Sequence, residues 1–354
     1  MPAGVCARGG HGVAMSRHRL RDGWTPQAWR FALDPTPTQA RSMASHVGAA
    51  RFAYNWGLGL VGRRLGERAR LREEALVGGA SQREADALAA TVEVPWSLYA
   101  LRREWNAAKA TLAPWWPANS KEAYSSGLDG LGRALRAYFD SASGRRSGAK
   151  VGWPRPKKRR SRASCRFTTG GFRVVDAHHV RLPRTGVVRT HEPTTKLTTA
   201  LNDAMARILS ATLSIEAGRW FISFGCEVAR EPCPPPQGPT VGVDVGVGCL
   251  AVVSTGRRVP NPRAAARYAR TMARRSRECS SRQRGSRRHA RSAAALARTH
   301  ARMACVRRDA MHKLTTGLAR SHGTVVVEHL TVANLLRSPA SRPDPQRAGH
   351  HLRT

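Results

Sequence analysis

Apolar residues recur every three or four positions along three stretches of the first half of the chain, which predicts three helices. The first stretch opens with a helix-start signature: Thr36 is the expected N-cap, Pro37 takes the first helical position and Gln39 completes a capping box. Residues 1–28 lack any period and are expected to be disordered. The three apolar stripes are Met43, Val47, Ala50, Tyr54, Leu58, Val61 and Leu65; Leu98, Leu101, Trp105, Ala108 and Leu112; and Leu128, Leu131, Leu135 and Tyr138.

The period changes from helical to two over residues 163–230, which predicts strands. Apolar and polar residues alternate over residues 209–215 and again over 220–228, and residues 216–219 are the predicted hairpin turn. Shorter strands are expected at about 166–168, 172–175, 180–182 and 187–189. We predict a small β-barrel, completed by a strand over residues 29–34 and interrupted by a helical lobe over residues 35–150.

A Val-rich run over residues 240–256 predicts two strands of a hairpin, and it contains one carboxylate, Asp244. Burying an ionised Asp costs several kcal/mol unless a cation or hydrogen bonds compensate. Asp244 is therefore either a metal ligand or a residue at a strand end that caps a turn. A second β-branched run, residues 324–327, is followed by Glu328. Two acids at the ends of neighbouring strands would begin an Mg²⁺ site of the kind found in RNase H-type nucleases.

The net charge of +37, from 60 Lys and Arg against 23 Asp and Glu in 354 residues, indicates a nucleic-acid partner. Arg accounts for 53 of the 60 cations, and its guanidinium binds phosphate bidentately. A basic ribosome-associated protein would have a similar composition, so charge alone decides only the class of partner. A basic linker over residues 151–162 is expected to lie on phosphates through Lys157, Lys158, Arg159 and Arg160.

The densest charge lies between the two acidic strands, where residues 257–308 contain 17 Arg and a single acid, Glu278. Five of these arginines fall at helical spacing and predict one basic helix face, which bound phosphates would stabilise against self-repulsion. They are Arg263, Arg267, Arg270, Arg274 and Arg277. A second helix with an apolar face is expected through Leu296 to Leu314, leading into the strand that ends at Glu328.

The seven cysteines form no Cys-x-x-Cys pair, so neither a zinc site nor a disulfide framework is expected. Reduced thiols, the absence of a secretory leader and the absence of an apolar run of about 18 residues favour a cytoplasmic, nucleoid-associated protein that does not contact a membrane. The adjacent histidines at 178–179 and 350–351 are not expected to bind metal, because neighbouring side chains point in different directions.

Four stretches together resemble the TnpB (OrfB) family of insertion-sequence-encoded, RNA-guided nucleases, which are related to type V CRISPR effectors. They are residues 48–58, residues 120–124, the hairpin at 241–256, and residues 296–336 with 312–316 and 327–330. The resemblance implies an α+β multidomain protein. A helical, helix-turn-helix-like lobe is inserted in a small wedge-like β-barrel, and an incomplete RNase H-like (RuvC) α/β domain follows.

The resemblance also implies a guide RNA and a target DNA as partners, with Mg²⁺ as the cofactor. Asp244 and Glu328 match the first two catalytic and metal-binding carboxylates of the family. The helical lobe, which contacts the guide–target duplex in the family, would contribute Arg51, Tyr54 and Asn55. The pattern also allows Tyr54 to be a core aromatic, and the sequence leaves that choice open.

The family carries a third catalytic Asp and a zinc ribbon after the Glu, and neither is recognisable in this sequence. Asp344, the only acid after Glu328, lies between prolines in a context that is neither strand nor helix. We therefore expect a Pro-rich linker at 231–239, an incomplete nuclease domain at 240–337 and a non-homologous tail at 338–354, explained by a frameshift or an early end. The expected consequence is weak nuclease activity, or nucleic-acid binding without cleavage.

Overall fold

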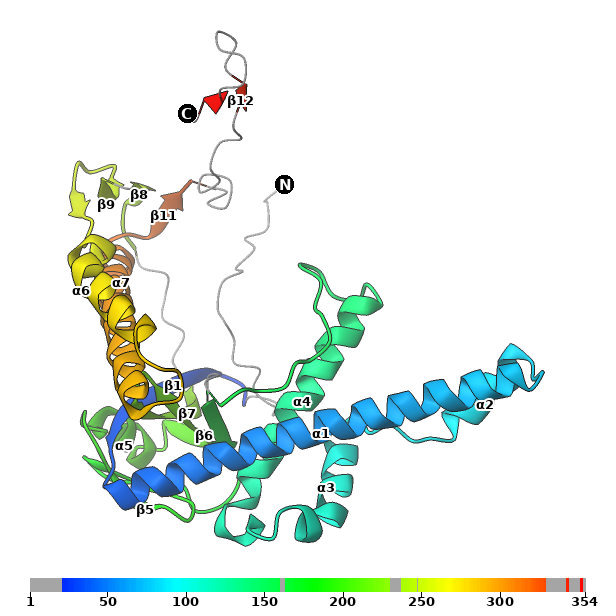
Figure 1. The fold of residues 1–354 in the computed structure, drawn as a ribbon. Helices are drawn as coiled ribbons and strands as arrows, with labels where there is room; N and C mark the ends of the chain where they lie inside the picture. Colours follow the sequence, from blue (N-terminus) through cyan, green and yellow to red (C-terminus); the bar gives the residue numbers. More distant parts are fainter. Residues whose placement is uncertain are drawn as a thin grey trace. The chain divides into compact units, whose positions relative to one another are not determined.

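The computed structural model of this chain, drawn in Figure 1, describes residues 21–159, 163–229, 237–246 and 248–328, together with the two-residue strands Arg342–Pro343 (β12) and His351–Leu352 (β13). The chain divides into two compact units, Met1–Pro232 and Cys233–Thr354, and each unit is described by itself.

The first unit contains a seven-stranded antiparallel sheet in the order β2-β6-β7-β1-β5-β4-β3. The strand before the helical lobe therefore lies in the middle of the sheet, between strands that follow the lobe. Ala217 and Gly218, both with positive φ, form the two-residue turn of the predicted β6–β7 hairpin. The strands are β1 Trp24–Asp34, β2 Ala163–Phe167, β3 Arg173–Asp176, β4 His179–Leu182, β5 Gly186–Thr190, β6 Ala206–Glu216 and β7 Arg219–Ala229.

This sheet is open, so the predicted closure into a barrel is not confirmed. Among the described residues, edge strand β2 pairs only with β6 and edge strand β3 pairs only with β4. Helices α1 and α4 pack against β2 instead. The strand that we expected over residues 29–34 begins at Trp24 and pairs with β7 from there, so residues 24–28 are ordered strand.

Helix α1 (Pro37–Val77) begins as the sequence predicts. The Thr36 hydroxyl accepts a hydrogen bond from the backbone of Gln39, whose side chain in turn accepts one from the backbone of Thr36. The predicted apolar stripe of α1 is buried from Met43 to Val61, and only Leu65 at its end is partly exposed. A short helix that we did not predict, α2 (Gln82–Ala90), packs against α1, where the Arg72 guanidinium lies 2.9 Å from the Asp86 carboxylate.

Helices α3 (Leu98–Leu112) and α4 (Lys121–Ala142) complete the helical part of this unit, with a 3₁₀ turn at Trp116–Ala118 between them. Helix α4 crosses α1 closely at Gly127, where an added Cβ would collide with the Ala50 carbonyl. A larger residue at Gly127 would push the two helices apart, so this glycine is needed for the crossing.

His46 joins α1 to the start of α4. Its Nδ1 lies 2.9 Å from the Ser42 carbonyl, and its Nε2 lies 3.1 Å from the Ser120 backbone nitrogen. Because a carbonyl only accepts and a backbone N–H only donates, Nδ1 carries the proton and the ring is neutral. Burial lowers the pKa of His46 despite the hydrogen bond to Ser42, and the charge of Arg184 lowers it further.

Glu122 joins α4 to the end of β2. Its carboxylate accepts hydrogen bonds from the Thr168 backbone N–H at 3.0 Å and from the Thr168 hydroxyl at 2.6 Å. Burial alone would raise the pKa of Glu122, but hydrogen bonds from Thr168 and Thr169 outweigh burial and lower it. The ionised carboxylate therefore stabilises the contact between helix and sheet. A further helix that we did not predict, α5 (Thr195–Asn202), precedes β6.

The second unit has a four-stranded sheet in the order β10-β9-β8-β11, in which β8 is antiparallel to β9 and parallel to β11. The predicted hairpin at 240–256 is thus confirmed as β8 and β9. The small core of this unit consists of Val241, Val243, Ala251, Val253 and Leu318. The strands are β8 Thr240–Asp244, β9 Cys249–Val253, β10 Arg258–Pro260 and β11 Thr324–Val327.

Helices α6 (Ala264–Ser280) and α7 (Arg287–Ser321) connect β10 to β11 and lie side by side as a helical hairpin (Figure 1). Both were predicted, although α7 begins earlier than its apolar stripe indicates. The Arg275 guanidinium fastens the two helices, because it donates hydrogen bonds to the Ala295 carbonyl at 2.7 Å and to the Thr299 hydroxyl at 2.5 Å.

Candidate functional site

The two candidate catalytic acids lie at the carboxyl ends of two neighbouring strands, β8 and β11, at the same edge of the second unit's sheet. Val327 is the register partner of Val243 in the parallel pair β8–β11. Asp244 follows Val243 as the last residue of β8, and Glu328 follows Val327 directly. Hydrogen-bonded strands lie about 4.8 Å apart, so the backbones that carry the two carboxylates are neighbours.

Both acids are exposed, which corrects the expectation of burial at Asp244. Residues alternate across a strand, so Val241 and Val243 face the core while Asp244 does not. Burial therefore does not mark Asp244 as a metal ligand, and the two acids are candidates because of their placement alone.

The donor set at this edge suits a hard divalent cation in kind, because Mg²⁺ is bound by carboxylate oxygens. The number of donors is small. Within residues 21–159, 163–229, 237–246 and 248–328, no cluster of three or more His, Cys, Asp or Glu residues could hold a metal ion. Asp244 and Glu328 would thus supply only part of the oxygen ligands that an ion requires.

The predicted basic helix face lies along α6, and all five of its arginines are exposed to solvent. Arg263 differs from the other four, because it is the N-cap residue of α6 and has left-handed backbone angles. Arg274 lies 3.8 Å from Glu278, an exposed ion pair that contributes little to stability. A solvent-facing row of guanidinium groups that makes few protein contacts is suited to nucleic-acid phosphates.

In the first unit, the basic linker is held against α1. Asn55 donates a hydrogen bond to the Lys157 carbonyl at 3.1 Å and accepts one from the Lys157 N–H at 2.8 Å. The Lys157 ammonium lies 4.1 Å from the centre of the Tyr54 ring. Tyr54 is only 5% exposed, which agrees with the core alternative for this residue.

The remaining predicted nucleic-acid contacts lie nearby or outside the described residues. Arg51 and Lys158 line one pocket together with Lys157. Arg159 is exposed, and Arg160 lies outside the residues that the structure describes. Two further arginines of this pocket, Arg133 on α4 and Arg166 on β2, were missed. In a chain with 53 Arg, nothing in the local sequence distinguishes these two from the others.

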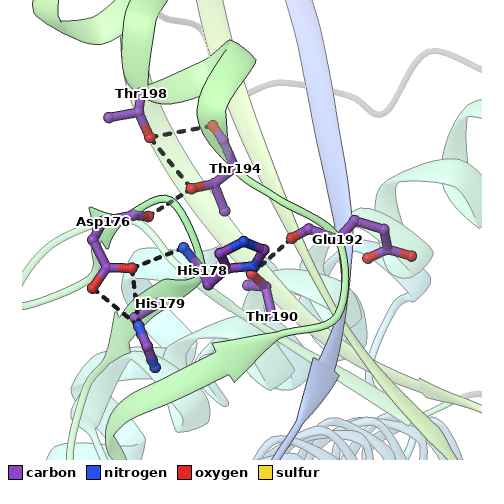
Figure 2. A network of polar contacts seen from close by, with 7 residues as sticks. All are labelled: Asp176, His178, His179, Thr190, Glu192, Thr194 and Thr198. Atoms are coloured by element: carbon purple, nitrogen blue, oxygen red, sulfur yellow. Dashed lines mark hydrogen bonds and ion pairs between the residues drawn. The ribbon is translucent and has the colours of Figure 1, made fainter.

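The adjacent histidines 178 and 179 belong to the polar network of Figure 2. The Asp176 carboxylate accepts a hydrogen bond from the His178 backbone at 2.8 Å and lies 2.9 Å from His179 Nδ1. The Thr194 hydroxyl donates to the Asp176 carbonyl at 2.7 Å. These contacts fasten the turn between β3 and β4 to the start of α5, which is a structural role.

Family models match two regions of the chain. Residues 223–338 match a model described as "Probable transposase", and residues 26–68 match one described as "Helix-turn-helix domain". The first region includes both candidate acids. The second corresponds in the structure to most of β1 and the first part of α1.

The chain is 37% identical over 342 residues to a Mycobacterium tuberculosis protein named "Putative RNA-guided DNA endonuclease", covering 91% of this chain and 70% of the relative. The chain belongs to this family. The family also includes the InsQ protein of Escherichia coli, which carries the same description and is 26% identical over 315 residues, covering 89% of this chain and 68% of the relative. The resemblance to the TnpB (OrfB) family is thereby confirmed.

A solved structure, the Cas12f1-sgRNA-target DNA complex, matches with a TM-score of 0.35 and 10% identity, covering 87% of this chain and 82% of that chain. No helix within the described part of the chain has the length and apolar character needed to cross a membrane.

Proposed function

We propose that this protein is an RNA-guided DNA endonuclease whose cleavage site is the edge of the second sheet at Asp244 and Glu328. The observation that carries the proposal is the parallel β8–β11 register, which puts the two acids at neighbouring strand ends in a chain whose relatives are named RNA-guided DNA endonucleases. The strand order β10-β9-β8-β11, with β11 parallel to the first strand, supports an RNase H-like (RuvC) domain over residues 240–337.

Asp244 and Glu328 would bind and orient a divalent cation through their carboxylate oxygens. When bound, Mg²⁺ supplies Lewis-acid stabilisation of the charge that develops on phosphate oxygens. The exposed arginines of α6, which belong to the same unit as the acids, would bind the DNA or RNA backbone. Because two carboxylates are a small ligand set, we expect weak cation binding and slow cleavage.

The first unit would hold the guide RNA and the paired target. We propose a helical lobe over residues 35–150, inserted in a wedge-like sheet domain of residues 29–34 and 163–230. The pairing of β1 with β5 and β7 on either side supports this division, because it joins the strand before the insertion to strands that follow it. The guide would read the target by base pairing, and the protein would contact the backbone and a short flanking motif.

Binding without cleavage is the second candidate function. The absence of any cluster of three metal-binding side chains from the described residues favours it. The basic surfaces in both units would serve this function equally well, so Mg²⁺-dependent cleavage distinguishes the two candidates.

The test is a cleavage assay. The full chain would be co-expressed with RNA from the end of its own insertion element, purified as a complex and given matched duplex DNA with and without Mg²⁺. Cutting that requires Mg²⁺ and is lost in Asp244→Ala supports the nuclease. No cutting by a complex that retains its RNA would refute the nuclease and support binding alone.

Asp309→Ala is the matched control. Asp309 is an exposed acid of the same unit, lies on α7 and is paired with Lys313 at 2.7 Å. Its removal changes the net charge by the same amount as Asp244→Ala, away from the sheet edge that carries the two acids. Cutting that is equally reduced in both variants would indicate a charge effect and remove Asp244 from the site.

A further inference from the structure

A small pocket in the first unit gathers cations from four separate segments. It has a volume of about 170 Å³ and lies where α1, α4, the basic linker and β2 meet. Its cationic residues are Arg51, Arg133, Lys157, Lys158 and Arg166. Because a water molecule occupies about 30 Å³ in the liquid, a cavity of this size has room for a phosphate group and a few waters.

The pocket is short of negative charge. No acid is among the described residues that line it, and the Asp129 carboxylate lies 3.0 Å from the Arg133 guanidinium. Partial burial, followed by the positive charge of Arg133, lowers the pKa of Lys157. Burial also lowers the pKa of Arg166, and Arg133 adds to this effect while Asp129 opposes it. An anion in the pocket would relieve this repulsion.

One hydrogen-bond donor of Arg166 is buried without a partner among the described residues. This donor is Nε, which is fully shielded from solvent. Leaving a buried donor of a charged group without a partner is unfavourable, so its occurrence calls for an explanation. The Ser126 hydroxyl accepts a hydrogen bond from the Arg166 backbone at 2.9 Å, which leaves its own proton free to donate.

The walls of the pocket are fixed before any ligand arrives. The paired hydrogen bonds between Asn55 and the Lys157 backbone anchor the linker to α1. Gly127 and Gly130 line the pocket on α4, and the absence of side chains there lets α4 approach α1 and Lys157. Such preorganisation reduces the entropy that binding would otherwise cost.

We propose that this pocket binds a single phosphate of a nucleic-acid backbone and thereby sets the position of the strand on the first unit. The proposal rests on the proposed nucleic-acid-binding function and deepens it. A phosphodiester fits better than a carboxylate, because its oxygens point in several directions and the donors come from α1, α4, the linker and β2. Arg133 and Arg166 would contact the phosphate, and the bonds from Asn55 would position Lys157.

The test measures binding of the full chain to a fluorescent DNA duplex and to a fluorescent RNA hairpin, each over a range of salt concentrations. The variants are Arg166→Gln, Arg133→Gln and the double variant. Each single variant is expected to bind about 10-fold more weakly and to reduce the salt slope by about one. Since both residues would contact one phosphate, the double variant is expected to reduce the slope no further. The nucleic acid that shows the loss identifies the source of the phosphate.

Arg136→Gln is the matched control, because Arg136 is exposed on the same helix and does not line the pocket. An equal loss in Arg136→Gln, an unchanged slope in Arg166→Gln, or slope losses that add in the double variant would each overturn the proposal. Arg133 is exposed, so Arg133→Gln keeps the test decisive if Arg166→Gln lowers the melting temperature. Absence of all binding by the unaltered chain would refute the proposed function itself, whereas intact binding with unaffected variants would refute the pocket alone.

Discussion

Val243 and Val327 lie opposite each other on parallel strands, and each is followed directly by one of the two candidate catalytic acids. Pairing of the preceding residues fixes the relative position of Asp244 and Glu328 through the backbone, although residues 245–323 separate the two strands. If the two acids bind a cation, they should therefore bind it together.

Loss of either acid is expected to be as harmful as loss of both. If the two carboxylates hold one cation, Asp244→Ala and Glu328→Ala should each slow Mg²⁺-dependent cleavage by about 100-fold or more, and the double variant should be no slower than the more affected single variant. Single-turnover rates on matched duplex DNA measure this. Multiplication of the two effects in the double variant would contradict a shared cation.

Substitution of Gly127 should disturb the helical lobe. A Cβ there would collide with the Ala50 carbonyl of α1, so Gly127→Val should lower the free energy of unfolding by about 3 kcal/mol. Gly62→Ala is the control, because an added Cβ on this exposed α1 glycine meets no atom within 4 Å and alanine favours a helix by up to about 1 kcal/mol. Thermal or urea unfolding followed by circular dichroism distinguishes the two, and equal stability of both variants would argue against close packing at Gly127.

The contact between α1 and α4 should weaken when the pH falls below about 6.5, the ordinary pKa of histidine. The pKa of His46 is lowered in the folded protein, so the unfolded chain binds the proton more readily. The stability that neutral His46 contributes is therefore present above the ordinary pKa and is lost as the pH falls through the lowered value. Melting temperatures measured between pH 7.5 and 5 should show this decline.

In His46→Gln the decline should be smaller, because the amide can accept the hydrogen bond from Ser120 but does not titrate. His179→Gln serves as the control, since His179 is only partly buried and pairs with Asp176 outside the contact between α1 and α4. A pH dependence that is unchanged in His46→Gln would assign the decline to other groups.

Arginines of α6 that bond to α7 should contribute to stability, whereas the exposed arginines of α6 should contribute to nucleic-acid binding. Arg275→Gln removes the hydrogen bonds to Ala295 and Thr299 and should destabilise the second unit by about 1–3 kcal/mol. Arg270→Gln removes an exposed charge and should leave the melting temperature unchanged while lowering the salt slope of nucleic-acid binding by about one. Unfolding curves and binding titrations of both variants test this, and the reverse pattern would show that the exposed face is misassigned.

The sequence was informative where one local rule decided the structure. The capping box at Thr36, the helical stripe of α1 and the alternation in β6 and β7 all predicted elements that the structure contains. Helices α2 and α5 are short, at nine and eight residues, and their apolar patterns are too brief to stand out.

Tertiary packing decided the features that local patterns could not predict. Alternation does not indicate whether the edge strands of a sheet meet, and α1 and α4 beside β2 leave the sheet open. The same is true of the pocket, since Arg133 and Arg166 come together only when α4 packs against β2. Asp244 was expected to be buried because of its Val-rich neighbours, but its side of β8 faces solvent.

The parallel pairing of β8 with β11 also constrains how the protein is made. On the ribosome, β8 and β9 can form their hairpin early, but Asp244 gains its neighbour only after β10, α6 and α7 have been synthesised. Contacts between residues so distant in sequence form slowly, because the intervening chain loses entropy before the contact is made. The acidic pair should thus be among the last features of the second unit to form, so nascent chains would acquire their arginine-rich helices before Asp244 and Glu328 become neighbours.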